Sequence, residues 1–108
     1  MCSSVIFFRK EHPWSLIIGS NRDEKLSKKS KFPGRHWLKN HPQIVGGFDV
    51  EKGGSWIAIN NSGLFSIVHN RNLEKDNYLI KKSRGHIIIK LLNFDRIESA
   101  LEYLQNID

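Results

Sequence analysis

The apolar residues in the first part of this chain gather in short, nearly uninterrupted runs. The first run lies within residues 3–10 and the second within residues 14–20, and Glu11, His12 and Pro13 separate them. Both runs are rich in β-branched and aromatic side chains, so they predict two strands joined by a tight connection, as in a hairpin. Because the runs do not alternate with polar residues, we expect strands that are covered on both faces, as inside a layered fold.

Further strands are predicted in the middle of the chain. The candidate strands are residues 43–46, 55–60 and 64–69. Asn60-Asn61-Ser62-Gly63 supplies the turn between the last two, because these residue types are typical of tight turns. The glycine pairs at positions 46–47 and 53–54 predict points at which two backbones approach closely.

The last part of the chain has helical periodicity. Ser83 is placed to cap a helix that runs to about Leu92, and Asp95 followed by Glu98 resembles a capping box at the start of a second helix. The apolar stripes are Ile87, Ile88, Leu91 and Leu92 in the first helix and Ile97, Ala100, Leu101 and Leu104 in the second. Strands followed by helices imply an α+β fold with helices layered on a sheet, and 108 residues imply one domain.

The chain carries a net charge of +6, much of it between residues 22 and 39. Serine, proline and glycine in this segment predict a solvated loop. The sequence lacks a helix-turn-helix pattern, zinc-finger spacing and an aromatic ribonucleoprotein signature, so we predict a lysine-rich surface and no nucleic-acid partner. A loop that attracts acidic ligands is the alternative. No apolar run approaches the ~20 residues of a membrane span, and the start lacks the basic region of a secretory signal, so we expect a cytoplasmic protein.

Cys2 is the only cysteine, which excludes an internal disulfide and a multi-cysteine metal site. If Met1 is removed, Cys2 becomes the N-terminal residue, and its α-amino group can serve as general base for its own thiol. A buried structural cysteine is the alternative. The five histidines are scattered without recognisable ligand spacing, so we predict no metal site. Axial ligation of haem needs one histidine and is left open by this reasoning.

Two polar elements follow predicted strands. Asn21-Arg22-Asp23-Glu24 comes directly after the second strand, and a hairpin would return this end to the start of the chain. A carboxylate there can hold an N-terminal ammonium, and an arginine can favour a thiolate; a charged turn with a solvated ion pair is the alternative. Asn70 follows the strand at 64–69, where an amide can donate to a developing oxyanion or act as an ordinary turn residue.

Taken in order, these motifs resemble the NRDE family, also called the Transport and Golgi organisation family. The resemblance is carried by Met1-Cys2 before an apolar strand, Asn21-Arg22-Asp23-Glu24, Gly53-Gly54-Ser55-Trp56, Asn61-Ser62-Gly63-Leu64, Asn70, and Ser83-Arg84-Gly85 before a helix. The family is similar in turn to N-terminal-nucleophile hydrolases of the bile-salt hydrolase and acyltransferase kind. Those enzymes have a four-layer αββα fold and cleave non-peptide amide bonds.

The resemblance implies a catalytic site made of Cys2, Asp23 and Asn70. Cys2 would be the nucleophile, Asp23 the carboxylate that orients its amine, and Asn70 the donor to the oxyanion. Asn21 and Arg22 would contact a small-molecule substrate, with no cofactor. Those hydrolases usually carry their arginine at an earlier position, so Arg22 is expected to point elsewhere if the strand register is kept.

Family members are considerably longer, and their later half completes the sheets. We therefore expect residues 1–108 to form a single partial domain, truncated relative to the family, with about five strands followed by two helices. An exposed inner sheet face would favour association into a homo-oligomer. Two alternatives to the hydrolase follow from the resemblance. One is a non-catalytic protein that binds or carries a small ligand such as haem, and the other is an inactive remnant.

Overall fold

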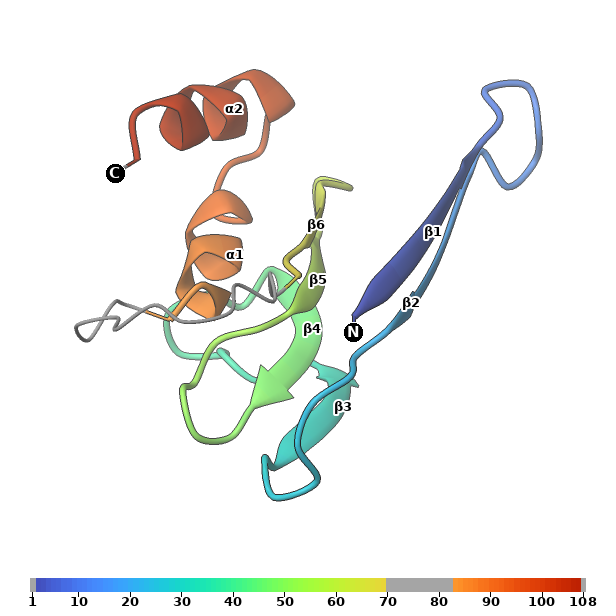
Figure 1. The fold of residues 1–108 in the computed structure, drawn as a ribbon. Helices are drawn as coiled ribbons and strands as arrows, with labels where there is room; N and C mark the ends of the chain where they lie inside the picture. Colours follow the sequence, from blue (N-terminus) through green and yellow to red (C-terminus); the bar gives the residue numbers. More distant parts are fainter. Residues whose placement is uncertain (1, 70–82, 108) are drawn as a thin grey trace.

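The computed structural model describes residues 2–69 and 83–107, which form an α+β arrangement (Figure 1). The elements are β1 (Ser3–Phe8), β2 (Leu16–Asn21), β3 (Ser30–Gly34), β4 (Ile44–Asp49), β5 (Ile57–Asn60), β6 (Phe65–Ile67), α1 (Gly85–Leu91) and α2 (Ile97–Gln105). The predicted α+β class is confirmed. The expected count of about five strands is wrong, because the described residues contain six.

Strands β1 and β2 form the predicted antiparallel hairpin, a sheet of two strands. The register pairs Phe8 with Leu16 near the connection and Ser3 with Asn21 at the open end. The expectation that both faces are covered is wrong for the described residues, because Val5 is 71% exposed and Phe8 is 69% exposed. The register nevertheless returns the end of β2 to the first residues of the chain.

Strand β3 lies in the segment that was expected to be a solvated loop, and this is the main correction to the predicted strands. Its backbone pairs antiparallel with β4, with Ser30 opposite Asp49 and an irregular register between Lys31 and Gly34. Lysine and proline are tolerated in a strand at the edge of a sheet. The residue types of β3 do not favour a strand by themselves. Its strand conformation comes from backbone pairing with β4.

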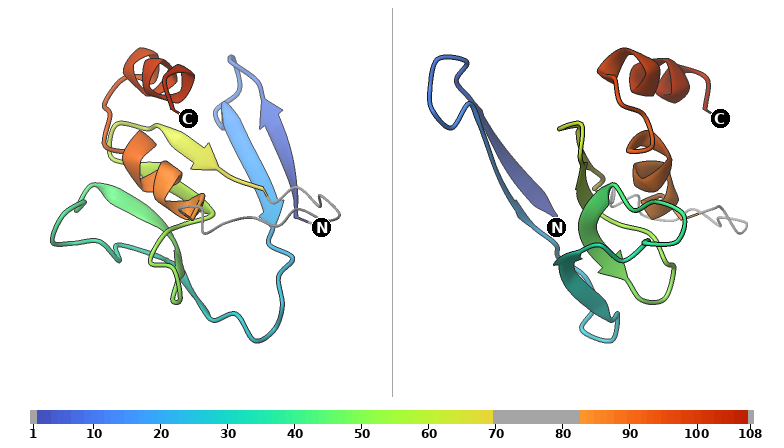
Figure 2. Two further views of the ribbon diagram at one scale, coloured as in Figure 1. Left: turned by 60° about the vertical axis from the view of Figure 1, so that its left-hand side comes forward. Right: turned by 180° about the vertical axis from the view of Figure 1, so that it is seen from behind.

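Strands β3, β4, β5 and β6 form the second sheet, in that order. Helices α1 and α2 lie on one side of this sheet and the β1–β2 hairpin lies on the other (Figure 2). The core sits between the sheet and α1. It contains Ile44 of β4, Ala58 of β5, and Ile88, Ile89 and Leu92 in and after α1.

The ends of the helices differ from the predicted caps. Ser83 Oγ accepts a hydrogen bond from the Gly85 N–H at 3.3 Å, while Arg84 occupies the N-cap position of α1. The predicted capping box of α2 is wrong, because Arg96 is the N-cap and makes no side-chain capping bond. Asp95 instead accepts a hydrogen bond from Ser62 Oγ at 3.1 Å, which ties the start of α2 to the β5–β6 turn.

The glycine pair at 53–54 lies at a close approach of two backbones, as predicted. A Cβ atom on Gly54 would lie 2.6 Å from the carbonyl carbon of Gly85, which is too close for any side chain. The Ser55 N–H donates to the Gly85 carbonyl at 3.2 Å. The connection after β4 is therefore held against the start of α1.

Candidate active site

Cys2 lies against the backbone of Asp23 at the open end of the hairpin. Its Sγ accepts a hydrogen bond from the Asp23 N–H at 3.3 Å and lies 3.6 Å from the Asp23 carbonyl oxygen, to which the thiol donates. Cys2 is half-buried. The structure thus brings together two of the predicted catalytic residues, which are 21 positions apart in the chain. The third, Asn70, lies outside the described residues.

Asn21 holds the first residue of β1. Its Oδ1 accepts a hydrogen bond from the Ser3 N–H at 2.9 Å and another from the Ser3 hydroxyl. Ser3 follows Cys2 directly, so this contact fixes the backbone next to the candidate nucleophile. Substrate binding by Asn21 stays a prediction.

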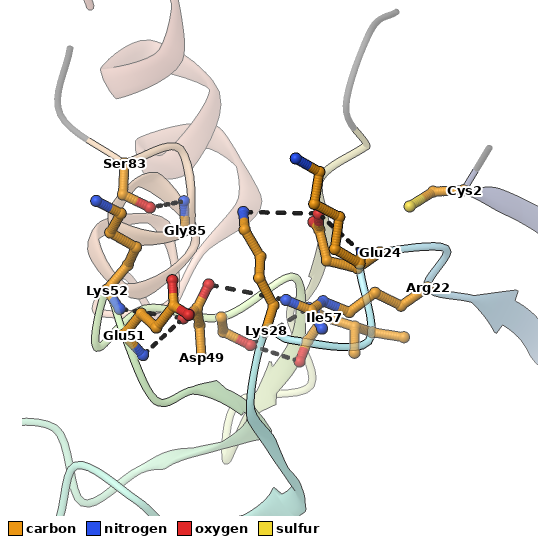
Figure 3. Close-up of polar contacts among 12 residues, drawn as sticks. Cys2, Arg22, Glu24, Lys28, Asp49, Glu51, Lys52, Ile57, Ser83 and Gly85 are labelled. Atoms are coloured by element: carbon orange, nitrogen blue, oxygen red, sulfur yellow. Dashed lines mark hydrogen bonds and ion pairs between the residues drawn. The ribbon is translucent and has the colours of Figure 1, made fainter. Parts of the chain in front are cut away.

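Arg22 points away from Cys2 and toward the four-stranded sheet (Figure 3). Its guanidinium carbon lies 4.5 Å from the centre of a Trp56 ring, and Nη2 lies 3.8 Å from Asp49 Oδ2. The arginine side chain is 16% exposed, so this stack and ion pair are partly shielded from water. A Cβ atom on Gly47 would lie 2.4 Å from the Trp56 ring, so the glycine makes room for that ring.

His69 makes a contact to β1 that sequence reasoning missed. Its Nε2 lies 2.7 Å from Ser4 Oγ, at a separation of 65 residues in the chain. Ser4 Oγ donates to Ser20 Oγ at 2.9 Å, and Ser20 Oγ donates to the Ser3 carbonyl at 3.2 Å. The contact joins the segment after β6 to the strand that follows Cys2. A histidine at the end of a strand carries no local signal for such a distant partner.

An apolar cleft of about 370 Å³ lies between β2 and the four-stranded sheet. It is lined by Leu16, Ile18, Pro33, Val45, Gly46, Ile57, Ala58, Ile59, Gly63 and Phe65. Ile57 and Ile59 of β5 therefore line the same cleft as Leu16 and Ile18 of the hairpin.

Within residues 2–69 and 83–107, no three His, Cys, Asp or Glu side chains are grouped so that they could hold a metal ion. In that part of the chain no helix has both the length and the apolar character that crossing a membrane requires.

Comparison with known proteins places the chain in a family. No curated protein and no solved structure matches it. The family model for Transport and Golgi organisation 2 matches residues 1–108, the full length of the sequence. Several motifs of the resemblance also meet in space, because Cys2 contacts Asp23, Arg22 stacks on Trp56, and Gly54 touches Gly85. The chain belongs to the Transport and Golgi organisation 2 family.

Proposed function

We propose that this chain carries an N-terminal-nucleophile hydrolase site in which Cys2 cleaves a non-peptide amide bond of a small molecule. The observation that carries the proposal is the contact of Cys2 Sγ with the backbone of Asp23. The Asp23 N–H lies 3.3 Å from the Cys2 sulfur, and a thiolate at this position can accept its hydrogen bond. The same contact supports a role for Asp23 in the reaction of Cys2.

The proposed reaction needs Met1 to be removed first. The free α-amine of Cys2 takes the thiol proton, and the thiolate attacks the carbonyl carbon of the amide. The oxyanion of the tetrahedral intermediate is stabilised by the side chain of Asn70. The leaving amine takes the proton from the ammonium, and water then attacks the thioester to release the acid and restore the thiol. The Asp23 carboxylate holds the ammonium in place while it carries the proton.

The residues around Cys2 support the proposal by fixing the position of the nucleophile. Asn21 holds the backbone of Ser3, and His69 holds the side chain of Ser4. A nucleophile that is held in one geometry reacts faster than one that must be ordered at each turnover. Arg22 attaches the end of the hairpin to the four-stranded sheet through its contacts with Trp56 and Asp49. Direct contact of Arg22 with a substrate stays a prediction.

The first test is the intact mass of the protein before and after brief treatment with iodoacetamide at neutral pH. We expect loss of Met1 and a single label on Cys2, added faster than on a cysteine in a short peptide. The Cys2→Ala variant should take no label. The Asp23→Asn variant should react roughly tenfold more slowly, because the ammonium of Cys2 loses the carboxylate that holds it next to the thiolate.

A neighbouring carboxylate provides the matched control. Glu24 pairs with Lys28 at 3.6 Å, so the Glu24→Gln variant should label at the wild-type rate. Retained Met1, or a Cys2 that reacts no faster than the peptide thiol, would sink the hydrolase proposal. If Asp23→Asn and Glu24→Gln slow the alkylation of Cys2 equally, Asp23 has no specific role in the reaction of Cys2.

Non-catalytic binding of a small apolar ligand is the second candidate function. The observation that favours it is the apolar cleft of about 370 Å³ between β2 and the four-stranded sheet. Ligand pockets of roughly 300–1,000 Å³ are common in proteins. Haem is the first ligand to test. The protein is titrated into haem, and a shift of the visible absorbance spectrum of haem measures binding. Binding that persists in the Cys2→Ala variant would favour this function, and an unshifted haem spectrum would remove haem from consideration.

A further inference from the structure

Residues 25–32 form a surface that combines positive charge with exposed apolar side chains, and we name it the basic turn segment. Its sequence, Lys25-Leu26-Ser27-Lys28-Lys29-Ser30-Lys31-Phe32, has four lysines and no acidic residue. Leu26 is 105% exposed and Phe32 is 92% exposed, the highest values among the large apolar side chains of the described residues. Large exposed apolar side chains among several lysines are typical of a segment that binds a membrane surface.

Backbone hydrogen bonds hold the first part of this segment in a turn. The Lys28 N–H donates to the Lys25 carbonyl at 2.9 Å, which places Leu26 and Ser27 at the tip. The Lys29 carbonyl accepts from the Val50 N–H at 3.2 Å, so the turn is anchored beside β4 before β3 begins. The last three residues of the segment, Ser30 to Phe32, form the start of β3 at one end of the molecule (Figure 1). Leu26 in the turn and Phe32 in β3 therefore both lie in backbone that hydrogen bonds hold in place.

The chemistry of the segment fits one kind of partner better than others. Lysines match anionic headgroups, while Leu26 and Phe32 can enter the acyl boundary beneath them. Stable attachment of a peripheral protein takes two such signals together, and this segment supplies both. A nucleic acid would neutralise the lysines and could stack a base on Phe32, but it would leave Leu26 in water. Glu24 offsets part of the charge through its ion pair with Lys28, and the remaining lysines carry the attraction.

We propose that the basic turn segment docks this protein onto anionic lipid bilayers. The docking is peripheral, because it uses the turn and the first residues of β3. It stands independently of the hydrolase site, because Cys2 takes no part in it.

The proposal is tested by sedimenting the full chain with vesicles of phosphatidylcholine alone or mixed with phosphatidylserine. We expect binding only to the mixed vesicles, and loss of that binding as salt rises from about 0.1 M to about 1 M. The Leu26→Ser and Phe32→Ser variants should each lower the partition coefficient roughly tenfold. The Lys29→Gln variant should lower it about fivefold.

The β1–β2 connection offers a matched control with the same chemistry. Trp14 and Lys10 are exposed there, so Trp14→Ser and Lys10→Gln should leave vesicle binding unchanged. Equal binding to neutral vesicles, absence of binding, or sensitivity to the control variants alone would overturn the proposal. A lysine-dependent binding that ignores Leu26 and Phe32, and that a DNA oligonucleotide reproduces, would identify a polyanion surface instead and also overturn it.

Discussion

His69 joins the segment after β6 to β1 through its hydrogen bond with Ser4. The His69→Ala variant should remove this link and cost about 0.5–1.5 kcal/mol, the usual net contribution of one hydrogen bond. Because Ser4 lies two residues after Cys2, we also expect slower alkylation of Cys2. The amide nitrogen of glutamine can donate to Ser4 in place of the ring, so His69→Gln should recover much of both losses. Thermal melting and the iodoacetamide rate provide the two readouts.

A histidine far from Ser4 separates a specific effect from a general one. The side chain of His86 is exposed in α1, so His86→Ala should change neither the melting temperature nor the alkylation rate. If His69→Ala lowers stability while Cys2 reacts at the wild-type rate, the hydrogen bond serves the fold alone. In that case His69 is not a positioning residue for the nucleophile.

At the scale of elements, Asn60 connects the β5–β6 turn to the end of α1. Its Nδ2 donates to the carbonyls of Leu92 and Phe94, at 3.1 and 2.8 Å. Its Oδ1 accepts from the N–H groups of Ser62 and Leu64, at 3.0 and 2.9 Å. Two of these four hydrogen bonds pair the N–H groups of the tight turn, and the other two pair backbone carbonyls that follow α1 and lack a partner within the helix.

The Asn60→Ala variant should therefore destabilise the protein by about 2–4 kcal/mol, because buried backbone groups lose their partners. The free energy of unfolding in urea measures this. Asn61 is the control, since its exposed side chain accepts one bond from Arg35 at 3.1 Å. We expect Asn61→Ala to cost about 0.5 kcal/mol. Equal costs for the two variants would show that the buried network does not hold the turn to the helix.

The elements that were predicted correctly have residue patterns typical of their structure within their own sequence, and the missed elements and contacts do not. The β1–β2 hairpin follows from two apolar runs around Pro13, and its closure is what predicted that Cys2 would meet Asp23. Strand β3 exists through pairing with β4, and its own residue types favour a loop. The contacts of His69 with Ser4 and of Arg22 with Trp56 join residues far apart in the chain, so no periodicity or turn motif encodes them.

For the whole molecule, the exposed hairpin is the feature with the largest consequence. Links between it and the four-stranded sheet include the Ser4–His69 hydrogen bond and the stack of Arg22 on Trp56. Its large apolar side chains with exposed surfaces are Val5, Ile6, Phe7, Phe8, Trp14, Leu16 and Ile17. A two-stranded sheet is marginally stable alone in water, and unpaired apolar strand edges favour pairing with another chain. We therefore expect this protein to associate with itself through the hairpin.

Sedimentation velocity over a series of protein concentrations tests this expectation. The wild-type protein should shift from monomer to dimer as its concentration rises. A lysine at Phe8 places a charge on the apolar surface, so Phe8→Lys should raise the concentration needed for association at least roughly tenfold, which corresponds to about 1.4 kcal/mol. Leu38 is also exposed but lies outside the hairpin, so Leu38→Lys should leave association unchanged. A wild-type protein that stays monomeric at every concentration, or equal shifts from both variants, would show that the hairpin is not the contact surface.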